Sequence, residues 1–121
     1  MNLDDIKELW QTAINAAKSE LPFEDVSYQS LTVDIHNASW CPDCEREVSL
    51  LLALDAQASK GFGELVLHSY EDKESYKARK QSGSLSITCL PTIIFYRDEK
   101  EIFRVEEDSA GQLIHLLSQA Y

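Results

Sequence analysis

Two cysteines with two residues between them are the part of this sequence best suited to chemistry. Cys41 and Cys44 lie in the stretch SWCPDCE, residues 39–45. Such a pair can form a reversible disulfide, supply two thiolates to a metal ion or crosslink the chain structurally. The sequence contains three cysteines, and an odd number cannot all pair within one chain, which argues against a disulfide scaffold. Redox chemistry and metal binding are therefore the two uses to distinguish.

The composition is typical of a soluble globular protein. The 121 residues suffice for one hydrophobic core, so we predict a single domain over residues 1–121. Hydrophobic residues make up 44% of the sequence and charged residues 26%, as in ordinary globular domains. No apolar run is long enough to span a membrane, so we expect no membrane association. The first residues lack the basic start and apolar stretch of a signal peptide, which predicts a cytoplasmic location.

The charge balance argues against a nucleic-acid partner. The 11 Lys and Arg residues are scattered among 21 Asp and Glu residues, and the formal net charge is −10. A phosphate-binding surface needs clustered basic residues, and the short basic cluster at residues 77–80 is flanked by acids. We interpret the acidity as a source of solubility, which also disfavours acidic partners.

The apolar pattern predicts alternating helices and strands. The expected order is a helix over 2–19, a connection over 19–29, a strand over 30–37, a helix over 44–59, a strand over 64–70, a helix over 71–82, strands over 86–98 and 99–107, and a helix over 109–121. Strand–helix–strand alternation requires parallel strands, and the final hairpin adds antiparallel ones. We therefore predict an α/β fold with a central mixed sheet of four to five strands flanked by helices.

The places of the two cysteines in this pattern give them different roles. Cys41 falls between a predicted strand and a predicted helix, and Cys44 falls about one turn inside that helix. The free N–H groups and the positive end of the helix dipole stabilise a thiolate on Cys41. We expect Cys41 to be exposed and to attack a disulfide, and Cys44 to be partly covered and to resolve the mixed disulfide. Pro42 stiffens the first turn, whereas the carboxylate of Asp43 opposes thiolate formation and tunes the redox chemistry.

The motif WCPDC at residues 40–44, with CLPT at residues 89–92, resembles the thioredoxin family. The resemblance extends from about residue 30 to the C-terminus, and its Pro-Asp insert is more similar to thioredoxin-related proteins with Trp-Cys-Pro-Asp-Cys than to thioredoxin itself. It implies a thioredoxin-like fold in which Cys41 is the nucleophile, Cys44 is the resolving thiol and Trp40 flanks them.

The resemblance also assigns roles to the residues around Pro91. It implies a cis peptide bond before Pro91, which places Leu90 and Thr92 beside Cys41 so that the Leu90 backbone pairs with an extended substrate. Cys89 borders the same surface and is a candidate regulatory thiol. The residues assigned to substrate binding are Trp40, Pro42, Leu90, Pro91 and Thr92.

One position departs from the family pattern. Thioredoxins keep a buried acid in the strand before the motif, and the matching position here holds Ile35. Asp34 and His36 flank Ile35, and either would replace the acid as a proton shuttle only if the register of the strand differs. The departure casts doubt on general thioredoxin activity and leaves the dithiol assignment intact.

These features predict a thiol–disulfide oxidoreductase that reduces protein or small-molecule disulfides through Cys41 and Cys44. No bound cofactor is needed because the electrons reside on the sulfurs. The partners that the resemblance implies are disulfide-containing proteins or small thiols, and an electron donor of the thioredoxin-reductase type or one linked to glutathione.

Two alternatives remain open. A zinc or iron–sulfur site would use Cys41, Cys44 and Cys89 with one of His36, His68 or His115. Zinc ribbons normally offer a second close cysteine pair, and the third cysteine here stands alone beside a proline, so we assign no residue as a metal ligand. The other alternative is a redox-inactive binding module on the same fold, against which the presence of both cysteines argues.

Overall fold

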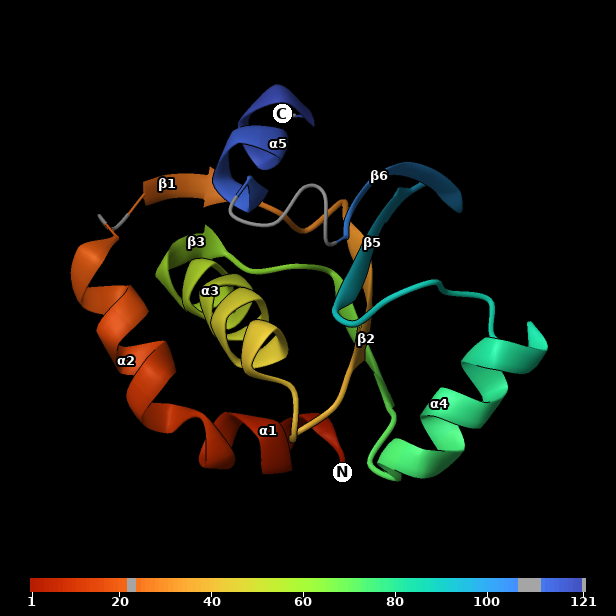
Figure 1. Cartoon of the computed structure of the whole chain (residues 1–121). Helices are drawn as coiled ribbons and strands as arrows, with labels where there is room; N and C mark the ends of the chain where they lie inside the picture. Colours follow the sequence, from red (N-terminus) through yellow and green to blue (C-terminus); the bar gives the residue numbers. More distant parts are fainter. Residues whose placement is uncertain (22–23, 107–111, 121) are drawn as a thin grey trace.

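Four strands form the central sheet, in the order β4–β2–β5–β6 (Figure 1). In this computed structural model they are β2 (Thr32–Asn37), β4 (Glu64–Ser69), β5 (Thr92–Arg97) and β6 (Lys100–Val105). β2 pairs in parallel with β4 and antiparallel with β5, and β5 pairs antiparallel with β6. The predicted α/β fold with a mixed central sheet flanked by helices is confirmed.

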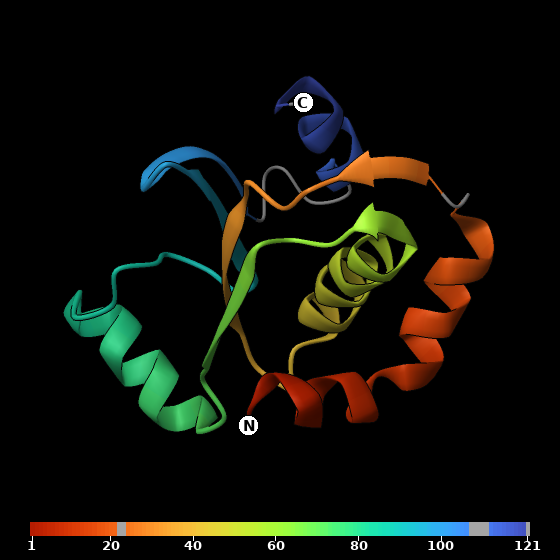
Figure 2. The same cartoon turned by 180° about the vertical axis from the view of Figure 1, so that it is seen from behind.

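The helices lie on both faces of this sheet. The structure describes residues 1–21, 24–106 and 112–120. The helices in these ranges are α1 (Leu3–Leu9), α2 (Gln11–Glu20), α3 (Pro42–Gln57), α4 (Lys73–Ser82) and α5 (Leu113–Ala120). α1, α2 and α3 lie on one face of the sheet and α4 lies on the other (Figures 1 and 2). Across the described ranges, each helix falls short of the length and apolar content that a bilayer crossing requires.

The hydrophobic core is shared by β2 and α3. Side chains alternate along a strand, and Val33 and Ile35 on one face of β2 are fully buried. Val48 and Leu51, which lie on one face of α3, are fully buried in the same cluster. The helical spacing of apolar residues after the cysteine pair was therefore a correct signal for the helix that packs on the sheet.

The single helix predicted over residues 2–19 is wrong, because the chain forms two helices that meet at Trp10. Asn2 caps α1 through a reciprocal capping box with Asp5, and Trp10 leaves the helical conformation at φ −104° and ψ 22°. Ile6, Trp10 and Ile14 recur every fourth residue, and all three are buried. The change of direction at Trp10 (Figure 1) keeps this apolar series in contact with the core, which periodicity alone does not reveal.

The connection predicted over residues 19–29 contains a strand, β1 (Glu24–Ser27), and this is a second correction. β1 pairs in parallel with β3 (Ala58–Lys60), which occupies the end of the region predicted as helix. α3 ends at Gln57, and the carboxylate of Asp55 then accepts a hydrogen bond from the Phe62 backbone N–H at 2.8 Å. A Cβ at Gly61 would collide with that carboxylate, so a larger residue there would displace Asp55 from its hydrogen bond with Phe62.

The strand predicted over residues 86–98 is shorter than expected. β5 begins at Thr92, immediately after Pro91, which has no backbone N–H to donate to a sheet. The hairpin to β6 is as predicted, and its two-residue turn holds Asp98 and Glu99 at φ 52° and 67°. The predicted helix at the C-terminus is present as α5, and the predicted elements over residues 107–111 and at residue 121 lie outside the described residues.

We predict that Trp10→Ala lowers the free energy of unfolding by about 3–5 kcal/mol, the range for truncating a buried tryptophan. Trp10 is only 4% exposed and joins both N-terminal helices to the core. The neighbouring Leu9 is 50% exposed, so Leu9→Ala is the matched control and is expected to change stability by about 0.5 kcal/mol or less. Urea denaturation followed by circular dichroism measures both, and equal losses would contradict the assigned core.

Candidate active site

Cys41 lies where β2 gives way to α3. It is the N-cap of α3, with extended backbone angles, and Pro42 occupies the first helical turn. The Cys44 backbone N–H donates a hydrogen bond to Cys41 Sγ at 3.3 Å. Sulfur thus takes the place that a serine or aspartate oxygen has at most helix starts. The result is a sulfur atom held against the positive end of a 16-residue helix.

The segment before β5 forms the opposite wall of the site. β2 and β5 are antiparallel, and His36 near the end of β2 pairs with Thr92 at the start of β5. The residues after β2 therefore meet the residues before β5, although they lie 49 positions apart in the sequence. Cys41 Sγ lies 3.8 Å from the carbonyl oxygen of Leu90, and the Leu90–Pro91 peptide bond is cis.

Burial distinguishes the two thiols of the pair. Cys44 is fully buried, and Cys41 is also largely covered, with 7% of its surface exposed. The expectation of an exposed Cys41 is therefore wrong in degree, because the Leu90–Pro91 segment covers most of the residue, but the order of exposure is as predicted. Burial raises the pKa of Cys44, and the hydrogen bond with Cys41 and then the negative charges of Cys41 and Asp43 raise it further. All three cysteines of the chain are free thiols.

Asp43 lies on the outer side of the first helical turn. Its side chain is 60% exposed and forms an ion pair of 3.1 Å with Arg46. Because water and Arg46 both reduce the field of this carboxylate, its effect on the buried sulfurs is small compared with that of burial. Pro42, beside it in the same turn, is exposed.

Trp40 is held in place by the residue that follows β4 and by two residues of α4. Its indole Nε1–H donates a hydrogen bond to the carbonyl oxygen of Tyr70 at 2.9 Å. The ammonium of Lys73 lies 5.3 Å from the centre of the indole ring, and the ring of Tyr76 packs beside it at 5.8 Å. These contacts fix the tryptophan next to the cysteine pair, and no local sequence pattern identifies them.

Glu71 holds the loop that leads from β2 to Trp40 in place through hydrogen bonds. Its carboxylate accepts hydrogen bonds from the Ser39 backbone N–H at 3.3 Å, from the Ser39 hydroxyl and from the Ser69 hydroxyl at 2.5 Å. Burial alone would raise the pKa of Glu71, but the hydrogen bonds from Ser39 and Ser69 outweigh it and lower that pKa. No local sequence pattern indicates this support, because Glu71 lies 32 positions after Ser39.

No acid of β2 lies beneath the thiols. Ile35 occupies the core face of the strand, and Asp34 and His36 alternate to the opposite face, so neither is the predicted substitute for the missing acid. The buried acid near the pair is instead Glu47, three residues after Cys44 on α3. The sequence analysis missed Glu47, because it follows the charged residues Glu45 and Arg46 and so resembles part of an exposed helix face.

The remaining predicted residues lie close to Pro91. Cys89 is half-buried, and its Sγ lies 3.7 Å from the Thr92 hydroxyl and 3.9 Å from the Pro91 carbonyl oxygen. Thr92 is fully buried and its hydroxyl donates to the Cys89 carbonyl oxygen at 2.8 Å. The Thr92 side chain is therefore not available to a substrate, contrary to its assignment as a binding residue. Leu90 remains partly exposed beside Cys41.

The three cysteines do not assemble into a metal site with a histidine. Among the described residues, the one group of three or more acidic, histidine or cysteine side chains spaced to hold an ion consists of Asp34, His36 and His68. The alternative that placed zinc or an iron–sulfur cluster on Cys41, Cys44 and Cys89 with a histidine is therefore wrong in its ligand set.

Comparison with known proteins places this geometry in a class of α/β folds. The chain matches no protein-family model and no curated protein sequence. Among solved structures, thioredoxin f2 of Chlamydomonas reinhardtii is 20% identical over 81% of this chain and 84% of its own, with a TM-score of 0.50. Oxidised thioredoxin O1 of Arabidopsis thaliana is 19% identical over 89% of this chain and 86% of its own, with a TM-score of 0.51. The fold is a thioredoxin fold, as predicted.

We predict that iodoacetamide at about pH 8 modifies Cys89 and Cys41 at least about 10-fold faster than Cys44. Only thiolates react, and Cys44 is fully buried with a raised pKa. Mass spectrometry of the digested protein over time measures the three rates. In urea the three thiols should react at similar rates, which serves as the control. Folded protein in which Cys44 reacts as fast as Cys41 would contradict the described burial.

Proposed function

We propose that this protein is a thiol–disulfide oxidoreductase that acts mainly as a reductase of disulfides in proteins or small molecules. The observation that carries the proposal is the meeting of three groups at one point: the Cys41 sulfur, the Cys44 N–H that donates to it and the Leu90 carbonyl 3.8 Å away. The sulfur lies at the positive end of the helix, where it can attack a disulfide, and the carbonyl lies beside it for pairing with an extended chain.

The reaction proceeds by two exchanges. The Cys41 thiolate attacks one sulfur of the substrate disulfide, whose S–S bond breaks as a Cys41–substrate disulfide forms and the first substrate thiolate leaves. Cys44 loses its proton to solvent or to a departing thiolate and attacks Cys41 Sγ. The Cys41–Cys44 disulfide forms, and the second substrate thiolate leaves and is protonated. Two electrons pass in total from the dithiol to the substrate.

The geometry makes the two exchanges occur in order. Burial and the hydrogen bond with Cys41 raise the pKa of Cys44 and keep this thiol protonated until Cys41 has reacted. Once Cys41 is in the mixed disulfide, its negative charge is gone, and so is one cause of the raised pKa of Cys44. Formation of the mixed disulfide therefore favours release of the second proton, which prepares Cys44 to resolve the intermediate.

The substrate surface consists of the exposed groups around the sulfur. Three groups border Cys41. They are Trp40, whose indole is held by the Tyr70 carbonyl, Pro42 at the start of the helix, and the Leu90–Pro91 segment. We propose that an extended segment of the substrate lies along Leu90 with its disulfide over Cys41. The electron donor is a dithiol flavoprotein of the thioredoxin-reductase type or a glutathione-linked system, acting in the cytoplasm. The single domain of residues 1–121 is proposed to carry out the reaction without a bound cofactor.

We predict that Cys41→Ser abolishes reduction of insulin by dithiothreitol above the uncatalysed rate, because the attacking sulfur is lost. Cys44→Ser should also lose turnover but accumulate mixed disulfides with substrates, which are visible on non-reducing gels. Cys89→Ser is the matched control and should retain activity, since that sulfur takes no part in the exchange.

Turnover by Cys41→Ser would contradict the nucleophile assignment. Capture of the same partners from an extract by the wild type and by Cys41→Ser/Cys44→Ser would favour the redox-inactive binding module instead.

We also predict a reduction potential for the Cys41–Cys44 pair nearer to about −270 mV, as in thioredoxin, than to about −120 mV, as in a strong oxidant. Strong oxidants stabilise the reduced thiolate, whereas Asp43 places a negative charge beside these sulfurs and helps to raise the pKa of Cys44. Equilibration with glutathione buffers measures the potential. Asp43→Asn should raise it slightly, and Glu45→Gln, an exposed acid of the same turn, should leave it unchanged. A wild-type value near −120 mV would exclude the reductase direction.

A further inference from the structure

The face of the sheet opposite α3 carries a polar group that the redox chemistry does not use. Residues 34 and 36 of β2 alternate to this face, and His36 stands directly beside His68 of β4 in the parallel register. α4 is the one helix on this face in the described part of the chain (Figures 1 and 2), and His36 is buried there, with 7% of its surface exposed. The side chains of His68 and Asp34 remain 41% and 28% exposed.

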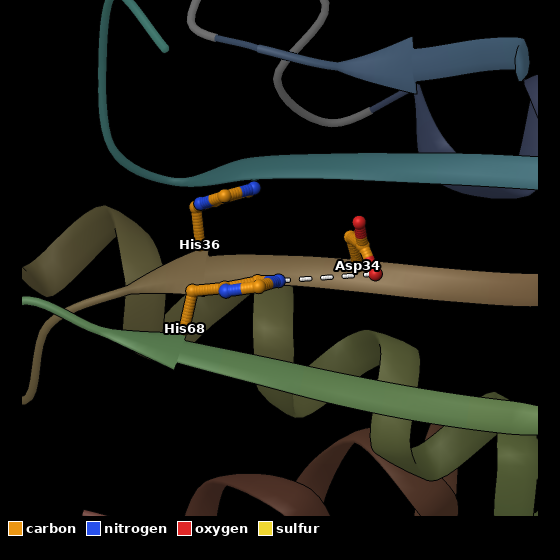
Figure 3. Close-up of side chains that lie close together, drawn as sticks. All are labelled: Asp34, His36 and His68. Atoms are coloured by element: carbon orange, nitrogen blue, oxygen red, sulfur yellow. Dashed lines mark ion pairs between the residues drawn. The ribbon is translucent and has the colours of Figure 1, made fainter. Parts of the chain in front are cut away.

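The three side chains converge. The imidazole rings of His36 and His68 stack with their centres 4.4 Å apart and their planes 10° apart. Both rings extend in the same direction, towards Asp34 (Figure 3), and His68 Nε2 lies 3.8 Å from Asp34 Oδ1. One potential ligand atom from each of the three residues lies within 4.8 Å of the other two.

Two further contacts prepare the nitrogens to bind a cation. His36 Nδ1 lies 2.9 Å from the hydroxyl oxygen of Tyr70, and when this hydroxyl accepts the Nδ1 proton, Nε2 keeps its lone pair. Metal-binding histidines are usually oriented by such a partner on the second nitrogen. His68 Nε2 is shielded from solvent and makes no hydrogen bond to any described residue; Asp34 Oδ1, at 3.8 Å, lies beyond hydrogen-bond distance.

We propose that Asp34, His36 and His68 bind a divalent first-row transition metal ion, with Zn²⁺ as the best match. Imidazole nitrogen with one carboxylate suits Zn²⁺ and its neighbours, whereas Mg²⁺ and Ca²⁺ prefer oxygen ligands alone. Three protein ligands leave a fourth position, which the open sheet face supplies with water. Ligand atoms around Zn²⁺ lie about 3.3 Å apart for bonds of about 2.0 Å, so the separations must shrink by about 1.5 Å at most. Rotation of the exposed Asp34 and His68 side chains provides this movement.

The surrounding charges are compatible with a bound cation. Arg104 of β6 acts on the group electrostatically, but its guanidinium is engaged by the carboxylate of Glu101, with Nε 2.9 Å from Oε2. Tyr96 of β5 is affected by the charge of Asp34 and contributes a neutral hydroxyl. The net charge of −10 also favours cations.

The test must separate this site from the thiols, which also bind zinc. The protein to use carries Cys41→Ser, Cys44→Ala and Cys89→Ser, and it is titrated with ZnCl₂ in competition with a chromophoric chelator. We expect one Zn²⁺ per chain, together with a higher melting temperature in the presence of the ion. If this variant does not fold, Cys89→Ser protein with Cys41 and Cys44 oxidised to a disulfide offers the same absence of free thiols.

Substitutions then locate the ion. In this cysteine-free background, Tyr70→Phe should weaken binding by about 10–100-fold, the usual cost of losing a supporting partner, and His68→Ala should weaken it more. Asp34→Asn, which retains the shape of the side chain, should also weaken it. His115→Ala, on exposed α5, is the matched control and should leave affinity unchanged. Nitrogen NMR of the imidazoles should show Zn²⁺-dependent shifts at His36 and His68 only.

Two results would overturn the proposal. One is the absence of Zn²⁺ binding tighter than about 1 mM in folded protein without free thiols. The other is unchanged affinity in folded His68→Ala and Asp34→Asn, which would place any bound ion elsewhere. Neither result bears on the redox function, because insulin reduction is measured with the wild-type thiols and without added metal.

Discussion

The antiparallel pairing of β2 with β5 is the constraint on which the rest of the structure depends. It pairs His36 with Thr92. The chain that continues from His36 leads to Cys41, and the chain that comes before Thr92 contains Leu90 and Pro91, so these two segments meet. The contact between Cys41 and the Leu90 carbonyl follows from that register. A slip by one residue would turn Ile35 out of the core and would also separate the sulfur from its neighbouring backbone. Fold stability and site geometry are thus determined by the same ladder of hydrogen bonds.

Alternation along β2 then separates two kinds of chemistry. Residues 33, 35 and 37 face α3, and the chain after them delivers the cysteine pair to the helix start. Residues 34 and 36 face the other side, where β4 contributes His68. One six-residue strand therefore leads to the redox-active sulfurs at its end and carries two residues of the proposed metal site, Asp34 and His36, on the face opposite α3. The two groups are isolated from one another by the strand itself, which is why the cysteines and the histidines do not form a common site.

The sequence allowed prediction of features that depend on neighbouring residues, and it did not allow prediction of contacts between residues far apart in the chain. The Cys-x-x-Cys pair, the apolar face of α3 and the β5–β6 hairpin are encoded over short stretches, and each was predicted. Pairing of β1 with β3 joins segments more than 30 residues apart, so the strand character of both was missed. The support of Ser39 by Glu71 is equally distant, as is the contact of His36 with Tyr70. Neither pattern nor propensity records which distant residues a sheet brings together.

The turn between β5 and β6 is a place where the stability of this chain can be increased. Asp98 and Glu99 both adopt left-handed backbone angles, a conformation that costs an ordinary residue roughly 1–2 kcal/mol and that asparagine and glycine adopt more readily. Glutamate is a poor choice there, and the tip is exposed and belongs to neither ligand group. Replacing these two residues with asparagine and glycine should therefore raise the free energy of unfolding. Such a change in the turn would make the scaffold of the dithiol more resistant to heat without altering the sulfur chemistry.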